Sequence, residues 1–193
     1  MLGKTAYTVL AVNLQGHKEL LGIYVAEGES SRLWLSVLSD LQARGVEDIL
    51  IACIDDLTGF ADAIESMFPH TDVQLCLGHQ MRNSLHYVAS GDQKLVSSDL
   101  QSVYKSSSLS SAAIKLEEVK IKWGEKYPLV IANWQRNWAR LMRFYEYPPA
   151  IRKVIYTINT VEGFHRQLRQ VTKTKGVFSN EMALIKLLYL VSE

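Results

Sequence analysis

Strand-like sequence is confined to the first 78 residues of this 193-residue chain, and this limits the available folds more than any other feature. Four apolar, β-branched segments lie there, at residues 7–14, 20–26, 48–54 and 73–77. Helical spacing of apolar residues separates the second from the third at 32–41, and the third from the fourth at about 59–68. The predicted order β-β-α-β-α-β is typical of an α/β domain with a mixed sheet.

The first two segments are predicted to form a hairpin, because the turn-prone residues 15–18 join them. The third segment is apolar almost throughout, as expected of a strand buried on both faces, and it ends at Asp55 and Asp56. Beyond residue 78 the pattern is helical. The predicted helices cover residues 79–89, 94–104, 112–127, 130–145, 160–173 and 180–191.

The composition is that of a soluble globular protein with one substantial core, with 48% hydrophobic and 21% charged residues. No segment approaches the roughly 18 uncharged apolar residues that span a bilayer, and the N-terminus does not match a signal peptide. We therefore expect a cytoplasmic protein with no membrane partner. Cys53 and Cys76 lie in apolar, strand-like runs, which predicts reduced, buried thiols and no disulfide.

The net charge of +1 conceals a division along the chain. Residues 1–130 contain 11 Lys and Arg against 16 Asp and Glu, a net charge of −5, whereas residues 131–193 contain 10 against 4, a net charge of +6. A basic face in the last third would suit a polyanion such as DNA, and a merely solvated basic helix would give the same count. Charge alone leaves both interpretations open.

Asp55 and Asp56 are site candidates because, in open α/β sheets, ligands bind outside the carboxyl ends of the strands. The alternative is that this acidic pair only caps the following helix. Glu162 begins a predicted helix on which Arg166, Arg169 and Lys173 recur every three or four residues. That spacing places a carboxylate at the head of a basic face, or makes a Glu162–Arg166 surface pair of about 0.3–0.5 kcal/mol.

Cys76 and His79 have the spacing of two zinc ligands. A second such pair is absent, and Cys53 lies on a different predicted strand, so the sequence favours a structural or DNA-contacting role over zinc. Trp134 and Trp138 are four residues apart on one predicted helix, with Arg136 between them. Packing in the core is the favoured role for the tryptophans, and stacking on a nucleic-acid base is the alternative.

Three longer strings resemble, in order, the Mutator-type insertion-sequence transposases of bacteria. They are Ile-Asp-Asp-Leu-Thr-Gly-Phe at 54–60, the Cys-x-x-His-Gln-x-Arg-Asn string within 74–85, and Tyr-Pro-Pro-Ala-Ile-Arg-Lys-Val-Ile-Tyr-Thr at 147–157. A later Asn-x-x-Glu-x-x-x-Arg-x-Leu-Arg string begins at Asn159. The resemblance covers essentially the whole chain.

The resemblance implies a ribonuclease-H-like fold with an Asp-Asp-Glu catalytic triad. Asp55 matches the second aspartate and Glu162 the glutamate, with a largely helical insertion between them. Asp56 stands where the family usually has a small residue. The implied domains are residues 1–90 as the first part of the core, 91–155 as the insertion, and 156–193 as the helices that carry the glutamate.

The implied chemistry is metal-dependent cleavage and transfer of DNA strands. The expected cofactor is Mg²⁺ or Mn²⁺, as two ions held by Asp55 and Glu162, because such hard cations prefer oxygen ligands. The partners would be transposon ends, target DNA and further copies of the enzyme, with the protein associated with the nucleoid. Candidate DNA-binding residues are His79, Arg82, Arg136, Arg166, Arg169, Lys173 and Lys175.

One member of the triad is not found. The first two predicted strands contain no carboxylate in their interiors, and the first aspartate of the chain, Asp40, lies in a predicted helix. We therefore expect the first strand of the fold to be missing, and the chain to be a copy shortened at the N-terminus and at the C-terminus. Such a fragment is expected to be inactive and marginally folded. The alternative function is a non-catalytic remnant that binds DNA or intact transposase.

Overall fold

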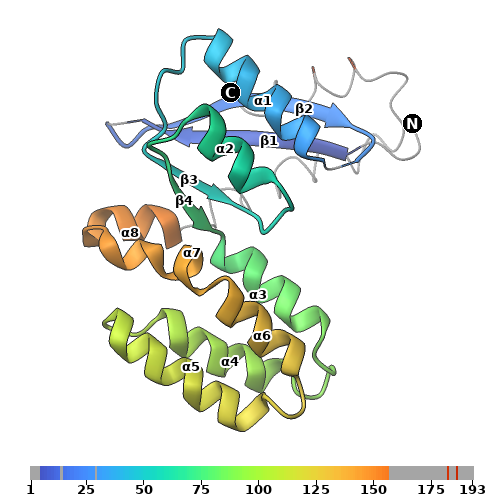
Figure 1. Cartoon of the computed structure of the whole chain (residues 1–193), viewed down its shortest axis with the longest axis vertical. Helices are drawn as coiled ribbons and strands as arrows, with labels where there is room; N and C mark the ends of the chain where they lie inside the picture. Colours follow the sequence, from blue (N-terminus) through green and yellow to red (C-terminus); the bar gives the residue numbers. More distant parts are fainter. Residues whose placement is uncertain (1–4, 14, 29, 157–181, 183–185, 187–193) are drawn as a thin grey trace. The chain divides into compact units, whose positions relative to one another are not determined.

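The computed structural model describes residues 5–13, 15–28, 30–156, 182 and 186. Two compact units make up the chain, and their architecture is α/β, as predicted (Figure 1). The first unit contains β1, β2, α1 and α2, and the second contains β3, β4 and the remaining described helices. The three-part division at residues 90 and 155 stays a prediction.

The predicted hairpin is confirmed. Strands β1 (Thr5–Val12) and β2 (Lys18–Ala26) pair in antiparallel fashion. Asn13 organises the turn, because its side-chain oxygen accepts hydrogen bonds from the backbone N–H groups of Gln15 and His17 at 3.1 and 2.9 Å. Gly16 follows with φ of +84°, a left-handed conformation that glycine adopts without strain.

Trp34 links the helices of the first unit to the hairpin. It lies on α1 (Ser31–Ala43), and its ring stacks on Phe60 at the start of α2 (Phe60–Met67), with centroids 4.0 Å apart. The Tyr7 ring on β1 packs edge to face with the same indole, with ring centroids 5.8 Å apart. Both predicted helices are confirmed, and one aromatic cluster holds them together.

Strands β3 (Ile51–Ile54) and β4 (Asp72–Leu75) form a parallel pair in the second unit, with Ile54 opposite Leu75. The described strands thus make two separate two-stranded sheets instead of the single mixed sheet that we expected. The prediction that 48–54 is buried on both faces is wrong: only four residues are a strand, and Cys53 is exposed. Both cysteines are free.

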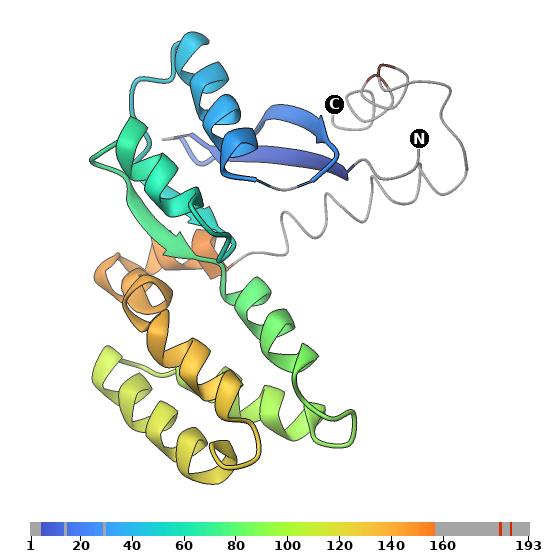
Figure 2. The ribbon, with the colours of Figure 1, turned by 45° about the vertical axis from the view of Figure 1, so that its right-hand side comes forward.

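The second unit is otherwise helical. Figures 1 and 2 both show α4 and α5 side by side, with α6 next to them. The helices are α3 (Leu77–His86), α4 (Gln93–Tyr104), α5 (Leu109–Trp123), α6 (Pro128–Arg136), α7 (Trp138–Met142), the 3₁₀ helix η1 (Arg143–Glu146) and α8 (Pro149–Tyr156). Helix α8 was not predicted, although Pro149 at its start suits the first turn of a helix.

The prediction of one helix over residues 130–145 is wrong, because the helix is interrupted at Asn137. Its backbone N–H donates to Asn133 O at 3.1 Å and ends α6, while its carbonyl accepts from Leu141 N at 2.9 Å and begins α7. A third segment, η1, follows. Asn137 itself is buried, with 8% of its surface exposed.

Large side chains from the helices fill the core of this unit. Trp134 and Phe144 are fully buried, and so is the polar Gln74 of β4. The Gln74 amide donates to the carbonyl of Leu141 at 2.8 Å, which ties β4 to α7. The core-packing role is therefore confirmed for Trp134. Trp138 is only half-buried, and both interpretations stay open for it.

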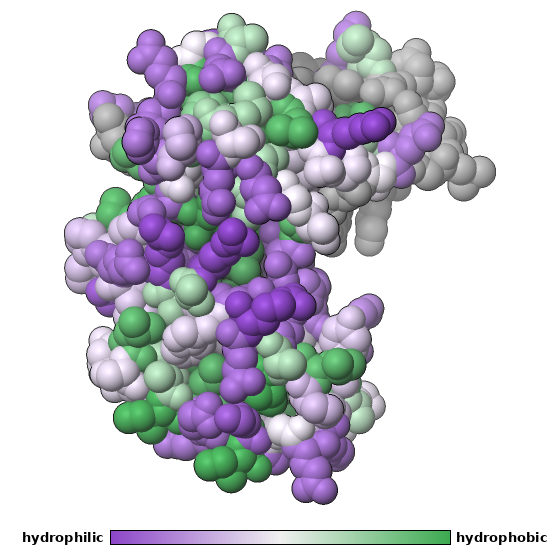
Figure 3. Space-filling model, viewed as in Figure 1, coloured by the Kyte–Doolittle hydropathy of each residue, from purple (hydrophilic) through white to green (hydrophobic). Residues whose placement is uncertain are grey.

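Apolar side chains are also exposed on the helices of the second unit. On the face drawn in Figure 3, green hydrophobic patches alternate with hydrophilic residues. The most exposed are Tyr87, Ile114, Ile121 and Leu129. Scattered apolar residues of this kind are normal on a protein surface.

Candidate active site

Asp55 is the first residue after β3, at the edge where the carboxyl ends of the two parallel strands meet. The hydrogen bonds between the two strands continue one residue beyond the end of β4, because Cys76 N donates to Ile54 O at 2.8 Å. Helix α3 then starts at Leu77. The strand register therefore brings residue 55 beside the first turn of α3.

His79 lies between Asp55 and Cys76. Its Nδ1 atom forms an ion pair with Asp55 Oδ1 and lies 2.9 Å from Cys76 Sγ. The sulfur also accepts the backbone N–H of His79 at 3.5 Å and so caps α3. Our expectation that Cys76 only packs in the strand is wrong, because β4 ends at Leu75 and leaves the cysteine at the helix cap. The three side chains form one polar cluster, with Asp55 and His79 each about one-third exposed.

The cluster favours the charged imidazolium. The hydrogen bond to Asp55, followed by that to Cys76, raises the pKa of His79 well above its ordinary value of 6.5, although partial burial opposes the shift. Without a metal ion the ring is therefore cationic at neutral pH, and an ion that binds its nitrogen must displace the proton. The cationic ring neutralises much of the Asp55 charge, and a positive group next to a carboxylate suits a site that meets phosphates.

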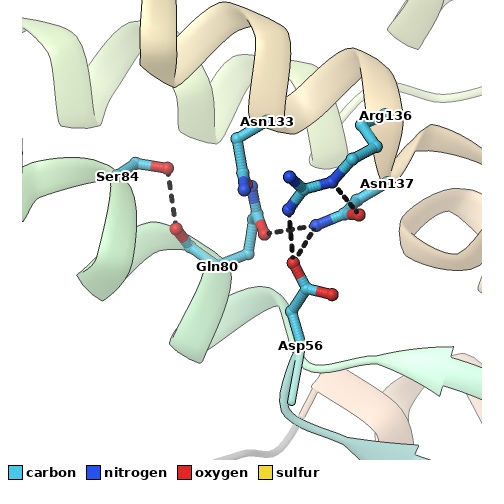
Figure 4. Close-up of polar contacts among 6 residues, drawn as sticks. All are labelled: Asp56, Gln80, Ser84, Asn133, Arg136 and Asn137. Carbon is cyan, nitrogen blue, oxygen red and sulfur yellow. Dashed lines mark hydrogen bonds and ion pairs between the residues drawn. The ribbon is translucent and has the colours of Figure 1, made fainter. Parts of the chain in front are cut away.

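Asp56 contacts a different part of the unit (Figure 4). Its Oδ2 atom accepts hydrogen bonds from Asn137 Nδ2 at 2.6 Å and from Arg136 Nη2 at 2.9 Å. Asn137 also approaches Gln80 Oε1 at 3.5 Å, and Gln80 donates to Asn133. Asp55 thus contacts His79 of α3 directly, whereas Asp56 is linked to the next residue of α3, Gln80, only through Asn137.

We expect the buried amide of Asn137 to stabilise Asp56 more than the charged Arg136 does. The Asn137 side chain is nearly inaccessible, whereas the Arg136 side chain is 66% exposed and screened by water. Asn137→Ala should lower the free energy of unfolding by about 1.5–3 kcal/mol, the range for a hydrogen bond to a charged group. Urea unfolding of the single and double variants with Asp56→Ala gives the coupling energies.

The expected coupling is about 1 kcal/mol or more for Asp56 with Asn137, and below about 0.5 kcal/mol for Asp56 with Arg136. Arg136→Ala is the matched control, because it removes the other donor to the same oxygen atom. The reverse order of couplings would show that formal charge, and not burial, stabilises this contact.

The chain matches the family model described as "Transposase, Mutator family" over residues 1–193. The chain belongs to the Mutator family of transposases. It is 40% identical over 189 residues to a probable transposase for an ISRM3-like insertion sequence element of Sinorhizobium fredii, and 39% identical to the ISRM3 transposase of Rhizobium meliloti. Each match covers 97% of this chain and 47% of the relative.

A probable insertion-sequence transposase of Corynebacterium diphtheriae is 36% identical over 99% of this chain and 56% of its own length. The chain thus spans about half the length of the curated relatives that it matches. Among the described residues, no helix is both long and apolar enough to cross a membrane.

In this Mutator-family chain, the predicted site residues that the structure describes are Asp55, His79, Arg82 and Arg136. The structure places Asp55 next to His79, and it places Arg82 on the exposed surface of α3. The paired carboxylate Glu162 and the basic residues Arg166, Arg169, Lys173 and Lys175 lie outside the described residues. The distance between Asp55 and Glu162, and the role of these residues in binding DNA, stay predictions.

Sequence reasoning missed two features of the site. It left Asp56 without a partner, although Asn137 and Arg136 both donate to it. It also placed the Cys-x-x-His string near the active site without predicting that Asp55 contacts it directly, although the three side chains come together. The second feature could have been found, because strands separated by a helix usually pair in parallel and their ends then share one edge.

Proposed function

We propose that this chain is part of the catalytic core of a DNA transposase, and that Asp55 is one carboxylate of its metal-dependent active site. The position of Asp55 directly after β3, at the carboxyl edge of a parallel strand pair, carries the proposal. The match to the Mutator family along the whole chain supports it. Because the chain spans half of its relatives, the activity belongs to the longer protein.

The proposed fold of the complete core is ribonuclease-H-like. The order of a hairpin, a helix, a strand that ends in an aspartate, and a long helical segment supports this assignment. In it, α4 to α8 belong largely to the helical insertion proposed at residues 91–155, between Asp55 and Glu162.

Mg²⁺ or Mn²⁺ suits the carboxylates better than it suits the rest of the described cluster. Asp55 offers hard oxygen atoms and is one-third exposed, so water and phosphate can reach it. Cys76 is a poor ligand for Mg²⁺, and Glu162 is the proposed second oxygen donor. Two such ions, when bound, activate the attacking oxygen and stabilise the leaving oxygen at phosphorus.

The protein's own side chains would position the DNA. Asp55 is held in place by His79, whose cationic ring attracts a phosphate to the same edge of the strand pair. Arg82 is exposed on the same helix. The excess of basic residues after residue 130 would bind the DNA backbone without regard to base sequence, through Arg166, Arg169, Lys173 and Lys175.

The test is nicking of supercoiled DNA that carries the insertion-sequence ends. It is run in Mg²⁺, in Mn²⁺ and in EDTA, with the 193-residue chain and with a form extended by the flanking segments of a relative. We expect the extended form to nick DNA only with a divalent cation. Nicking that persists in EDTA would contradict the proposal. Tight DNA binding by the extended form without any nicking would favour the non-catalytic alternative.

A further inference from the structure

We propose that Asp55, Cys76 and His79 form a binding site for a thiophilic divalent cation, and that Zn²⁺ is the ion that fits it best. A carboxylate oxygen, a thiol sulfur and an imidazole nitrogen from these residues all lie within 4.8 Å of one another. The sequence alone argued against zinc, because it offered only one Cys-x-x-His pair. The parallel register of β3 and β4 supplies the third ligand.

The backbone holds the three donors in place. Cys76 is the residue before α3, and His79 lies in the first turn, so its ring folds back to the sulfur at 2.9 Å. Asp55 approaches from the neighbouring strand end. A tetrahedral zinc ion with bonds of about 2.0–2.3 Å needs ligand atoms about 3.3–3.7 Å apart, which small side-chain rotations supply.

The donor set selects the ion. Zn²⁺ accepts sulfur, nitrogen and oxygen ligands, whereas Mg²⁺ requires a shell of oxygen atoms. Three protein ligands leave the fourth position of a tetrahedral ion to water, as at open zinc sites. The Asp55 and His79 side chains are each about one-third exposed, so the cluster is open to solvent.

Zinc at this cluster would also regulate the proposed active site, and this part of the inference rests on the proposed function. Asp55 cannot bind the zinc ion and serve an oxygen-ligated Mg²⁺ site at full strength at once. Zinc would then inhibit strand cleavage, because Asp55 would bind zinc together with Cys76 and His79 and would no longer be available to Mg²⁺. The inhibition would depend on Cys76.

The first experiment measures binding without DNA. The reduced 193-residue chain is titrated with Co²⁺, which takes zinc's place and absorbs strongly when it has a thiolate ligand in a tetrahedral site. We expect a thiolate-to-cobalt absorption band that Zn²⁺ then abolishes by displacement. Cys76→Ser should remove the band, and His79→Gln should weaken binding by about 10-fold or more, because loss of a ligand costs at least as much as loss of an outer-shell partner.

Cys53→Ser is the matched control, because Cys53 is the other cysteine of the chain and is not part of the cluster. It should leave the band unchanged. The Cys76→Ser variant should still fold, because serine is a favourable helix cap and can replace the sulfur at the start of α3. Circular dichroism checks this. A band that survives Cys76→Ser in a folded chain, or that disappears in Cys53→Ser, would overturn the proposal.

The second experiment separates this inference from the proposed function. In the nicking assay, the zinc concentration that halves the rate is measured for each variant relative to its own rate without zinc. That concentration should rise by about 10-fold or more in Cys76→Ser. An unchanged value would overturn the regulatory part. If no variant nicks DNA, the proposed function fails while the cobalt band still decides whether the site exists.

Discussion

Replacing Trp134 with alanine is expected to lower the free energy of unfolding by about 3–5 kcal/mol, the usual range for truncating a fully buried tryptophan. The indole has no exposed surface, and its Nε1 atom donates to Ser84 Oγ at 2.8 Å. Ser84 in turn donates to the carbonyl of Gln80 at 2.7 Å, so the tryptophan also supports the helix that carries His79. Urea unfolding of the 193-residue chain measures the loss.

Two variants separate packing from hydrogen bonding. Trp134→Phe keeps an aromatic ring in the core but removes the donor to Ser84, so it should cost clearly less than the alanine variant. Trp138→Ala is the matched control, since that ring is only half-buried. An equal loss for the two alanine variants would contradict the assignment of Trp134 as the centre of this core.

Replacing Asp55 with asparagine is expected to reduce metal-dependent nicking by the extended protein by about 100-fold or more. Asparagine keeps the shape of the side chain but loses the charge that binds a divalent ion, and metal stabilisation of the transition state is worth several kcal/mol. The same substitution removes the ion pair with His79, so circular dichroism must show that the variant folds.

Asp62→Asn is the control for a general effect of charge, because Asp62 is an exposed carboxylate on α2. It should leave the rate of nicking within about two-fold, as is usual for surface substitutions away from the site. Nicking that survives Asp55→Asn and disappears with Asp56→Asn in a folded protein would assign the catalytic role to Asp56 instead of Asp55.

Local patterns predicted the elements that depend on nearby residues. The hairpin follows from a turn between two β-branched segments, and α1 to α5 follow from apolar spacing within single helices. The strand end at Asp55 was also visible, because the charged pair stops an apolar run. These features have short-range causes, so one sequence suffices to predict them.

Long-range contacts were not predictable in the same way. The division of the predicted helix 130–145 accompanies the burial of Asn137 against Asp56, and these two residues are far apart in the sequence. The exposure of Cys53 depends on which elements cover β3, and a run of apolar residues does not show that. The contact of Asp55 with Cys76 also depends on a long-range pairing, that of β3 with β4, and here the order of the elements was the available signal.

The two adjacent carboxylates after β3 contact different partners, and this decides how the protein tolerates mutation of either one. Asp55 faces the start of α3, and Asp56 faces the junction of α6 and α7. Because the two side chains contact different partners, we expect that a mutation that removes one acid is not rescued by the other. The two aspartates are adjacent in the sequence, but neither is placed to make the contacts of the other.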